Sequence, residues 1–248
     1  MGGGASKGRP GLLGEALLIG VGYVLYSMIQ NGITGHAGTA FANARRVLEL
    51  EERLGIAVER RVNRYTDGVP WLVVTADYFY SIMWIAGTLG VLGWLYLRRP
   101  GEYRPARRTL FATTLLALLG FWRFPLAPPR LLPGYVDTVV AHGTWGSFSD
   151  GELASVSNHF AAMPSMHFGW SLWAGLVLIR YARPVWVRVL GGLYPVATLL
   201  VIIATANHYV LDAVGGAAAL LLGYLAQRAA VAAARSVRRA VFRSPAEG

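Results

Sequence analysis

Six apolar segments, each close to the length of a membrane-spanning helix, recur along the 248-residue chain. A helix needs roughly 20 apolar residues to cross the hydrocarbon core of a bilayer. The chain is also 54% hydrophobic and only 15% charged, which is too apolar for an ordinary soluble domain. We therefore predict an all-α fold, a polytopic membrane helix bundle with six transmembrane helices at residues 12–29, 71–97, 109–124, 163–181, 185–205 and 210–234.

The two longest segments between these apolar runs differ in kind. Residues 31–69 combine an apolar stripe with many charges, which predicts one or two amphipathic helices, broken near Gly55. Such helices would lie at the membrane interface or pack as a charged layer on top of the bundle. Residues 126–162 contain two adjacent prolines and several glycines, so we expect a long extracytoplasmic loop that forms part of a site.

Both ends of the chain are basic. Residues 1–11 form a short glycine-rich lead, and residues 235–248 form an arginine-rich tail. A signal peptide is a competing interpretation of the first apolar run, but no convincing small-residue cleavage site follows it and Glu15 interrupts its start. We find no internal repeat, so residues 12–234 are expected to form a single domain.

The distribution of arginine predicts the orientation in the membrane. The net charge is +10, a balance that can indicate nucleic-acid binding. The arginines lie between the apolar segments, however, and they gather on the side shared by both termini and by residues 98–108 and 180–188. Because positive residues accumulate in cytoplasmic loops, we predict a multi-pass protein of the cell membrane with both termini cytoplasmic and no nucleic-acid partner.

A polar start marks the fourth apolar segment. Pro164 and Ser165 suit the first turn of a helix, because proline lacks the amide proton left unbonded there and serine can cap the remaining amides. His167 follows in that turn, where free amides and the helix dipole attract anions. A titratable side chain at the mouth of an apolar helix indicates a functional site.

A second histidine precedes the sixth apolar segment. His208 and Asp212 are four residues apart, so on a helix they would share one face, and the carboxylate could hold one ring nitrogen. Taken alone, such a pair is also an ordinary helix contact. The apolar flanks favour a functional interpretation. The predicted topology also places His167 and His208 at the same, extracytoplasmic level.

Three motifs resemble the PAP2 (type 2 phosphatidic acid phosphatase) superfamily. Arg123 and Arg130 are separated by six residues, residues 163–167 read Met-Pro-Ser-Met-His, and residues 207–212 contain the second histidine and its aspartate. Within the superfamily, the chain looks most like a bacterial branch similar to inositol phosphorylceramide synthase. Ile202 stands where the phosphatase form of the third motif carries arginine, and the synthase-like members also lack that arginine.

The resemblance implies a phosphohistidine mechanism on a lipid phosphate or phospholipid at the extracytoplasmic face of the membrane. His208, oriented by Asp212, would attack phosphorus, and His167 would protonate the departing oxygen. The substrate phosphate would be bound by three further residues: Arg130, Arg123 and Ser165. The activity would be that of a phosphohydrolase or a phosphotransferase.

No metal or cofactor is expected at this site. The sequence has no cysteine, which excludes thiolate metal sites and a cysteine nucleophile as well as disulfides. Asp137, Asp150 and Glu152 are scattered in the long loop rather than clustered as Mg²⁺ ligands would be.

Other charged or titratable residues have plainer interpretations. Arg123 could instead be an interfacial anchor that reaches lipid headgroups. His36, His142 and His159 have no partner at a telling spacing, so we interpret them as loop or interface residues. Asp77, the one charge in the second apolar segment, could pair with an arginine inside the bundle.

A transporter or a structural membrane protein is the alternative to an enzyme. A transporter would be expected to carry polar residues at mid-membrane and often a repeat, and Asp77 alone is a poor case for one. A purely structural role is disfavoured by the intact set of two histidines and one aspartate. The sequence leaves open hydrolysis against transfer, the identity of the lipid, and the oligomeric state.

Overall fold

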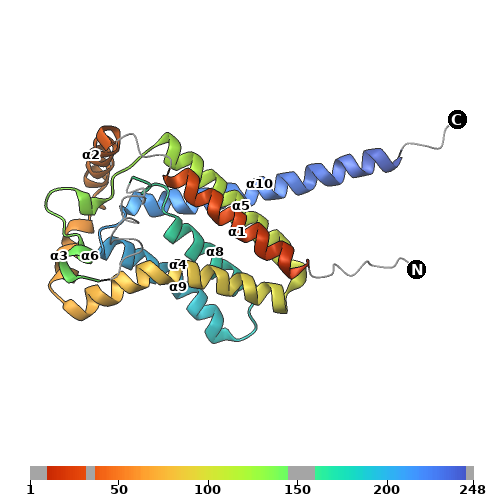
Figure 1. The fold of residues 1–248 in the computed structure, drawn as a ribbon, viewed down its shortest axis with the longest axis horizontal. Coiled ribbons are helices and arrows are strands. Elements are labelled where there is room, and N and C mark those ends of the chain that lie inside the picture. Colours follow the sequence, from red (N-terminus) through yellow and green to blue (C-terminus); the bar gives the residue numbers. More distant parts are fainter. Residues whose placement is uncertain (1–9, 32–36, 145–159, 244–248) are drawn as a thin grey trace.

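The computed structural model describes residues 10–31, 37–144 and 160–243, and it shows the predicted all-α helical bundle (Figure 1). Six longer helices form the body of the bundle: α1 (Leu12–Asn31), α4 (Pro70–Arg98), α5 (Pro100–Arg123), α8 (Met166–Tyr181), α9 (Val185–Ala204) and α10 (Val210–Arg243). The other helices of the described ranges are α2 (Ala37–Leu54), α3 (Glu59–Asp67), α6 (Thr138–His142) and the 3-10 helix η1 (Pro129–Leu131).

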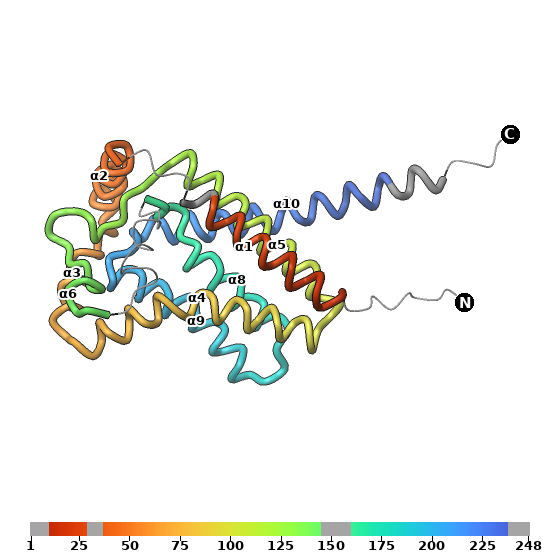
Figure 2. The backbone as a smooth tube through the Cα atoms, in the orientation of Figure 1, coloured from red at the N-terminus to blue at the C-terminus, as the bar shows by residue number. Residues whose placement is uncertain are grey.

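The bundle has two different ends. Helices α2, α3 and α6 gather at one of them, which we call the capped end (Figures 1 and 2). The start of α1 and the last turns of α10 lie toward the other, where α4 passes into α5 and α8 into α9. We call this the arginine end, because those connections carry Arg98, Arg99 and Arg183. Successive long helices run in opposite directions between the two ends (Figure 2).

Helix α8 lies at the centre of the packing, against α4, α5, α9 and α10. Its contact with α10 is close enough to need glycine, since a Cβ on Gly216 would lie 2.4 Å from the carbonyl oxygen of Ser165. A Cβ on Gly175 would likewise lie 2.3 Å from the carbonyl oxygen of Gly191 on α9. Small residues that let helix backbones approach in this way are typical of membrane helix bundles. The glycines thus fix where α10 and α9 lie against α8.

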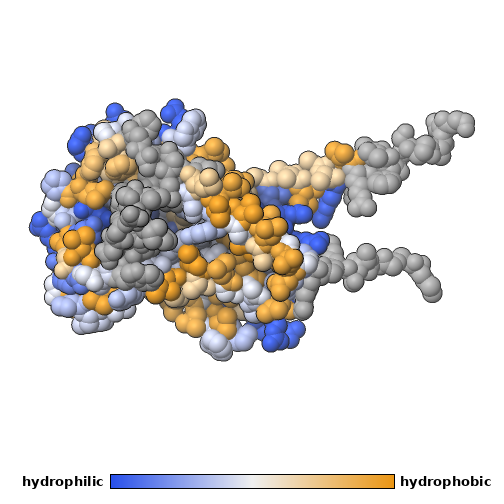
Figure 3. Space-filling view, in the orientation of Figure 1, coloured by the Kyte–Doolittle hydropathy of each residue, from blue (hydrophilic) through white to orange (hydrophobic). Residues whose placement is uncertain are grey.

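The middle of the bundle presents apolar side chains outward (Figure 3). On α9, for example, Leu193 and Leu200 are 54% and 61% exposed. Three described helices are long and apolar enough to cross a membrane, at Pro70–Arg98, Val185–Ala204 and Val210–Val237. The apolar part of α1 is shorter, at Leu12–Met28; α5 carries charge in its first half; and α8 has 16 residues. The structure therefore shows a multi-pass membrane bundle, and length and composition identify three of the six predicted spans among the described residues.

Two predicted boundaries were wrong. Residues 98–108 were expected to be mostly loop, but α5 begins at Pro100, because proline is well tolerated in the first turn of a helix. The predicted basic tail from residue 235 continues α10 as far as Arg243. The predicted break between two amphipathic helices is confirmed, because Gly55 ends α2 with a left-handed φ of 70°.

The segment that follows α5 is held by hydrogen bonds rather than being a free loop. The amide of Leu126 donates to the carbonyl of Phe160 (2.7 Å), and the amide of Ala127 donates to the carbonyl of Ala40 (3.2 Å). The side-chain amide of Asn43 on α2 donates to the carbonyl of Pro125 (2.9 Å). These bonds bring η1 beneath α2, next to the turn between α9 and α10. Residues 145–159 of the predicted loop, and His36 and His159, lie outside the described residues.

Candidate active site

His208 lies in the tight turn between α9 and α10. The amides of Asn207 and His208 both donate to the carbonyl of Ile202, at 3.1 and 3.2 Å, and Ala206 adopts a left-handed φ of 50°. The turn buries the imidazole, which is only 4% exposed. As predicted, His208 precedes the last long helix, because α10 begins at Val210.

His208 and Asp212 are in contact. His208 Nδ1 lies 3.3 Å from Asp212 Oδ2 and 3.0 Å from the carbonyl oxygen of Ala162. Both neighbours are acceptors, so Nδ1 carries the ring proton and Nε2 is left with its lone pair. Asp212 Oδ2 also accepts a hydrogen bond from the amide of Tyr209 (3.0 Å), which fixes the carboxylate in the first turn of α10. The arrangement fixes both the tautomer and the orientation of the imidazole.

His167 lies in the first turn of α8, beside His208. Ser165 is the N-cap of α8, and its hydroxyl oxygen accepts a hydrogen bond from the amide of Phe168 (3.3 Å). The amide of Ser165 donates to the carbonyl of Asp212 (2.9 Å), so the starts of α8 and α10 are tied together. The centroids of the His167 and His208 rings are 5.6 Å apart.

Aromatic residues of α4 hold the His167 ring. Tyr80 stacks on it with a centroid distance of 4.1 Å and an interplanar angle of 16°, and Trp84 lies against it at 5.2 Å. His167 Nε2 is buried and has no hydrogen-bond partner among the described residues. A buried polar nitrogen without a partner, next to a second imidazole, is the kind of group that a reaction uses. No motif in the sequence indicated that Tyr80 or Trp84 belongs to the site.

Arg130 reaches the same turn from η1. Its amide donates to the carbonyl of Ala206 (2.8 Å), and its Nη1 donates to the side-chain oxygen of Asn207, the residue before His208. Its Nε lies 3.4 Å from Asp137 Oδ2, and the side chain is 19% exposed. The guanidinium is therefore held beside His208 by an amide and a carboxylate.

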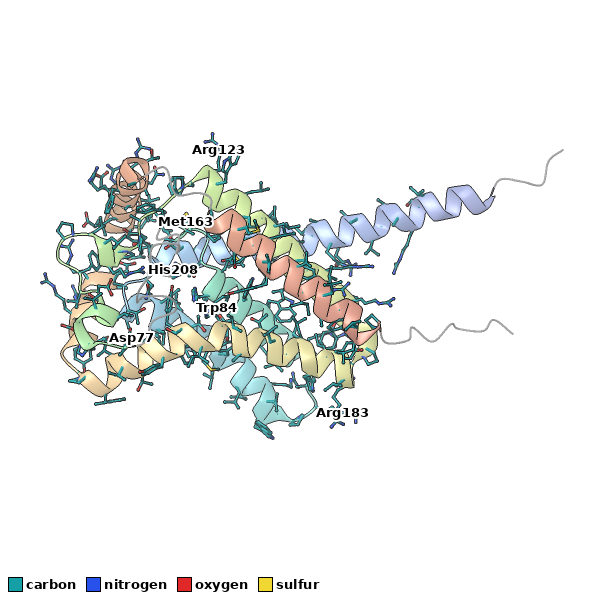
Figure 4. The ribbon with its side chains drawn as sticks, viewed as in Figure 1. Asp77, Trp84, Arg123, Met163, Arg183 and His208 are labelled. Carbon is teal, nitrogen blue, oxygen red and sulfur yellow. The ribbon has the colours of Figure 1, made fainter. Side chains whose placement is uncertain are left out.

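Arg123 is not brought to this site. It is an exposed residue in the last turn of α5, and Figure 4 shows it pointing outward, away from His208. Of the two interpretations open from the sequence, the position favours the interfacial anchor.

Two of the many charged residues in the segment 31–69, Glu51 and Glu59, support the site from within the protein. Glu51 Oε1 accepts from the amide of Leu211 (2.7 Å), and Glu59 Oε1 accepts from the amide of Val210 (2.9 Å). Both glutamates are 0% exposed. Loss of hydration raises the pKa of Glu51 to about 9, and the adjacent Glu59 contributes to the increase. Helices α2 and α3 thus cap the first two amides of α10 with carboxyl groups.

The helical period of α2 contained a signal for this burial. Glu51 follows Val47 by four residues and Ala44 by seven, so it lies on the apolar stripe and not on the charged face. Val47 is 6% exposed and Ala44 is fully buried. The charge of Glu51 concealed its position in the pattern.

Two other residues have partners that were not expected. His142 Nε2 lies 2.8 Å from Asp67 Oδ1, so this histidine joins α6 to the end of α3. Asp77 does not pair with an arginine; its two oxygens accept hydrogen bonds from the hydroxyls of Thr138 and Thr144, each at 2.6 Å. The first contact holds α6 against α3, and the second holds the segment from Thr138 to Thr144 against α4.

No group of three or more histidine, aspartate or glutamate residues is placed to hold a metal ion within residues 10–31, 37–144 and 160–243. Two imidazoles, a carboxylate behind one of them and a guanidinium beside it can perform nucleophilic and acid–base chemistry on an anion. Which anion reacts here does not follow from the geometry alone.

Comparison with protein families identifies the chain's relatives. Residues 45–226 match the PAP2 superfamily, and this range contains every residue of the site described above. Comparison with curated proteins and with solved structures found no significant match. The match extends over most of the chain, from α2 to the middle of α10. The chain therefore belongs to the PAP2 superfamily, whose members are membrane proteins of the phosphatase type.

Proposed function

We propose that the protein is an integral membrane lipid phosphatase or phosphotransferase that forms a phosphohistidine on His208. One observation carries the proposal: His208 Nδ1 lies between two acceptors, Asp212 Oδ2 and the carbonyl of Ala162, at 3.3 and 3.0 Å. A neutral imidazole held in this way has its Nε2 lone pair available for attack. His167 lies close by, with 5.6 Å between the centroids of the two rings, so that both imidazoles could contact one phosphoryl group.

The proposed reaction has two steps. His208 Nε2 attacks phosphorus, the bond from phosphorus to the leaving oxygen breaks, and that oxygen takes a proton from His167. Water or an acceptor alcohol then gives a proton to His167 and attacks phosphorus, and the bond from phosphorus to nitrogen breaks. Asp212 stabilises the positive charge that His208 acquires while it carries the phosphoryl group. The enzyme returns to its starting protonation state.

Two residues are proposed to bind the substrate phosphate. Arg130 is held beside the turn that carries His208, and an arginine can bind two phosphate oxygens at once. The amide of Ser165 already donates to Asp212, so Ser165 would contribute through its hydroxyl. Arg123 is proposed to contact lipid headgroups at the membrane surface and not the reacting phosphate.

We also propose that all six long helices span the membrane, with the capped end outside the cytoplasm. The alternating directions of these helices support this, and so does the concentration of arginine at the opposite end. Helices α5 and α8 would cross the membrane because neighbouring helices shield the charged part of α5 and the short helix α8 from the lipid. The substrate would then be a lipid of the outer leaflet.

The membrane orientation can be tested with single cysteines, because the native chain has none. Val140 on α6 is 77% exposed, and Ser236 on α10 is also exposed. An impermeant thiol reagent added to intact cells should label Val140→Cys, and should label Ser236→Cys only after permeabilisation. The reverse pattern would show that the capped end faces the cytoplasm.

We further propose that the activity resembles that of inositol phosphorylceramide synthase. Ile202 stands where phosphatase members carry arginine, and it is fully buried in an apolar cluster with Ile203 and Ala213. The site therefore has one positive charge fewer than a phosphatase of this superfamily, which favours a substrate phosphate that is a diester, with less charge than a monoester.

A product assay tests the function. The purified protein would be given labelled phosphatidic acid or labelled phosphatidylinositol, each with and without ceramide as an alcohol acceptor, because transfer to ceramide gives a lipid that differs from either substrate. Free phosphate or inositol phosphate would identify hydrolysis, and a labelled acceptor lipid would identify transfer. His208→Ala should give neither. If folded wild-type protein gives no product with any combination while binding either lipid, the enzymatic proposal is wrong.

A further inference from the structure

A groove of about 1050 Å³ lies at the arginine end, between α5, α8 and α10. Five exposed arginines line it: Arg104 and Arg108 from α5, Arg180 from α8, and Arg228 and Arg235 from α10. Glu102 is the one acidic residue among its lining side chains. The groove therefore has a strong excess of positive charge, and it belongs to the end of the bundle remote from His208. Roughly 27 Å of helix separates Val210, at the start of α10, from Arg228.

Three of these arginines lie at one level along the bundle. Helices α8 and α10 run in the same direction and touch at Gly169 and Gly216. Eleven residues further along, α8 reaches Arg180 and α10 reaches a position next to Arg228. Because every residue adds about 1.5 Å of rise, equal numbers of residues reach equal depths.

Helix α5, which runs in the opposite direction, places Arg108 at the same level along the bundle. It runs antiparallel to α10 and touches it where a Cβ on Gly223 would lie 2.5 Å from the hydroxyl of Thr113. Five residues toward the arginine end from this contact are Arg108 on α5 and Arg228 on α10. Arg108, Arg180 and Arg228, which all line the groove, thus lie at one level along the bundle.

The walls deeper in the groove, toward the middle of the bundle, are apolar. Leu172 and Leu176 precede Arg180 on α8, and Leu221 and Tyr224 precede Arg228 on α10. Leu176 and Leu221 are 51% and 59% exposed. Figure 3 shows hydrophilic side chains next to hydrophobic ones along the face of α10 that is turned toward the other helices. The groove changes from apolar to basic in the direction that leads out of the bilayer.

We propose that this groove binds one anionic phospholipid from the leaflet on the arginine side, at a site separate from the active site. The headgroup phosphate would be held by Arg108, Arg180 and Arg228, since guanidinium groups bind phosphate oxygens in a bidentate manner. An acyl chain would lie along Leu176 and Leu221. Basic pockets between membrane helices on the cytoplasmic side recognise anionic headgroups in this way. The lipid is not a substrate here, because it does not reach His208.

The alternative is that the arginines form an ordinary hydrated surface that attracts any anionic membrane. A matched pair of variants separates the two. The groove variant combines Arg108→Gln, Arg180→Gln and Arg228→Gln. The control combines Arg98→Gln, Arg183→Gln and Arg188→Gln, which removes the same charge from exposed residues that do not line the groove. Figure 4 shows Arg183 at the turn between α8 and α9, away from α10.

The measurement is retention of dioleoylphosphatidylglycerol against dioleoylphosphatidylcholine, by native mass spectrometry of full-length protein taken from mixed vesicles of the two lipids into detergent. Wild type and control should each keep one phosphatidylglycerol, and the groove variant should bind it at least tenfold more weakly. Equal weakening of both variants, or no weakening in the groove variant, would overturn the proposal. Melting curves in phosphatidylcholine alone check that both variants are folded, and Arg180→Gln alone should give a partial loss if the triple variant is not.

Two further arms complete the test. Leu221→Asn keeps every arginine but makes the groove wall polar, so it should also weaken retention if an acyl chain lies there. Glycerol 1-phosphate, which has the headgroup chemistry without acyl chains, should fail to displace the lipid at matched concentration; displacement would contradict the acyl contact. His208→Ala should retain the lipid fully, so this test is independent of the proposed catalysis.

Discussion

Charged or titratable residues lie at both ends of α8 and α10, but they are buried and paired at one end and exposed at the other. At the capped end, His208 and Asp212 are buried and hydrogen-bonded to each other, and Glu51 and Glu59 cap the start of α10 from within the protein. At the arginine end, five exposed arginines surround a groove with one carboxylate among its lining residues. Burial with fixed partners orients a group for chemistry, whereas exposure with excess charge suits the binding of a flexible anion.

The largest expected effect comes from breaking the pair at the capped end. Asp212→Asn should leave the protein folded but lower kcat by about 10²–10⁴-fold, because the amide no longer stabilises the imidazolium or fixes its tautomer. The groove variant Arg108→Gln, Arg180→Gln and Arg228→Gln is the control and should keep kcat within about threefold in phosphatidylcholine micelles. Steady-state kinetics checks both. Comparable losses in the two proteins would remove the functional distinction between the ends.

The next effect separates the two arginines of the first motif. Arg130→Gln should lower kcat/KM by about 10²–10³-fold, since it removes a guanidinium held beside His208. Arg123→Gln should change it by no more than about threefold, because Arg123 is exposed and points away from the site. A large loss in Arg123→Gln would mean that Arg123 reaches the substrate after all.

The glutamate caps should affect stability more than chemistry. Glu51→Ala leaves the amide of Leu211 without its acceptor and should destabilise the protein by about 1–3 kcal/mol. Glu51→Gln keeps the accepting oxygen and can still donate to Glu59, so it should be close to wild type at neutral pH. Thermal unfolding in detergent measures both changes. If glutamine were as harmful as alanine, the hydrogen bond would not be the reason for the cap.

The pH dependence of the same pair has a definite sign. Burial raises the pKa of Glu51 from its ordinary value of 4.5 to about 9, so folding takes up a proton between those pH values. The stability contributed by this proton is complete below pH 4.5 and is lost as the pH rises toward 9. Glu51→Gln removes the titration, so its melting temperature should fall less than that of wild type between pH 6 and pH 9.

The smallest expected effect is that of a chelator. The proposed chemistry is carried by His208, His167 and Arg130, so turnover should be unchanged in saturating EDTA. An assay with and without chelator, repeated after adding Mg²⁺, checks this. Loss of turnover with EDTA and its return with Mg²⁺ would require a different mechanism.

The parts of the structure that depend on local sequence were predicted well. The break at Gly55, the N-cap at Ser165 and the starts of α1, α4, α9 and α10 follow from neighbouring residues. The parts that depend on distant contacts were not. Glu51 meets Leu211, and Asp77 meets Thr138 and Thr144, across more than 60 positions of the chain.

The site shows the same division. The spacing of His208 and Asp212 indicated their contact, and the structure adds that a turn before α10, and not one helix face, brings them together. Tyr80 and Trp84, which hold His167, lie on α4 with no motif to mark them. The first motif contains Arg123 and Arg130, and nothing in the motif shows which of them reaches the site. Only the path of the chain after α5 brings Arg130, and not Arg123, beside His208.

The central claim, that His208 attacks and His167 supplies the proton, is tested most directly by rapid quench with labelled substrate. A nitrophenyl phosphate ester has a leaving group that needs no proton, and an alkyl ester has one that does. His208→Ala should form no acid-labile phosphoenzyme with either ester. His167→Ala should form it with the nitrophenyl ester and about 10²–10⁴-fold more slowly than wild type with the alkyl ester. Phosphoenzyme in His208→Ala, and none in His167→Ala even with the nitrophenyl ester, would contradict the assignment and reverse the two roles.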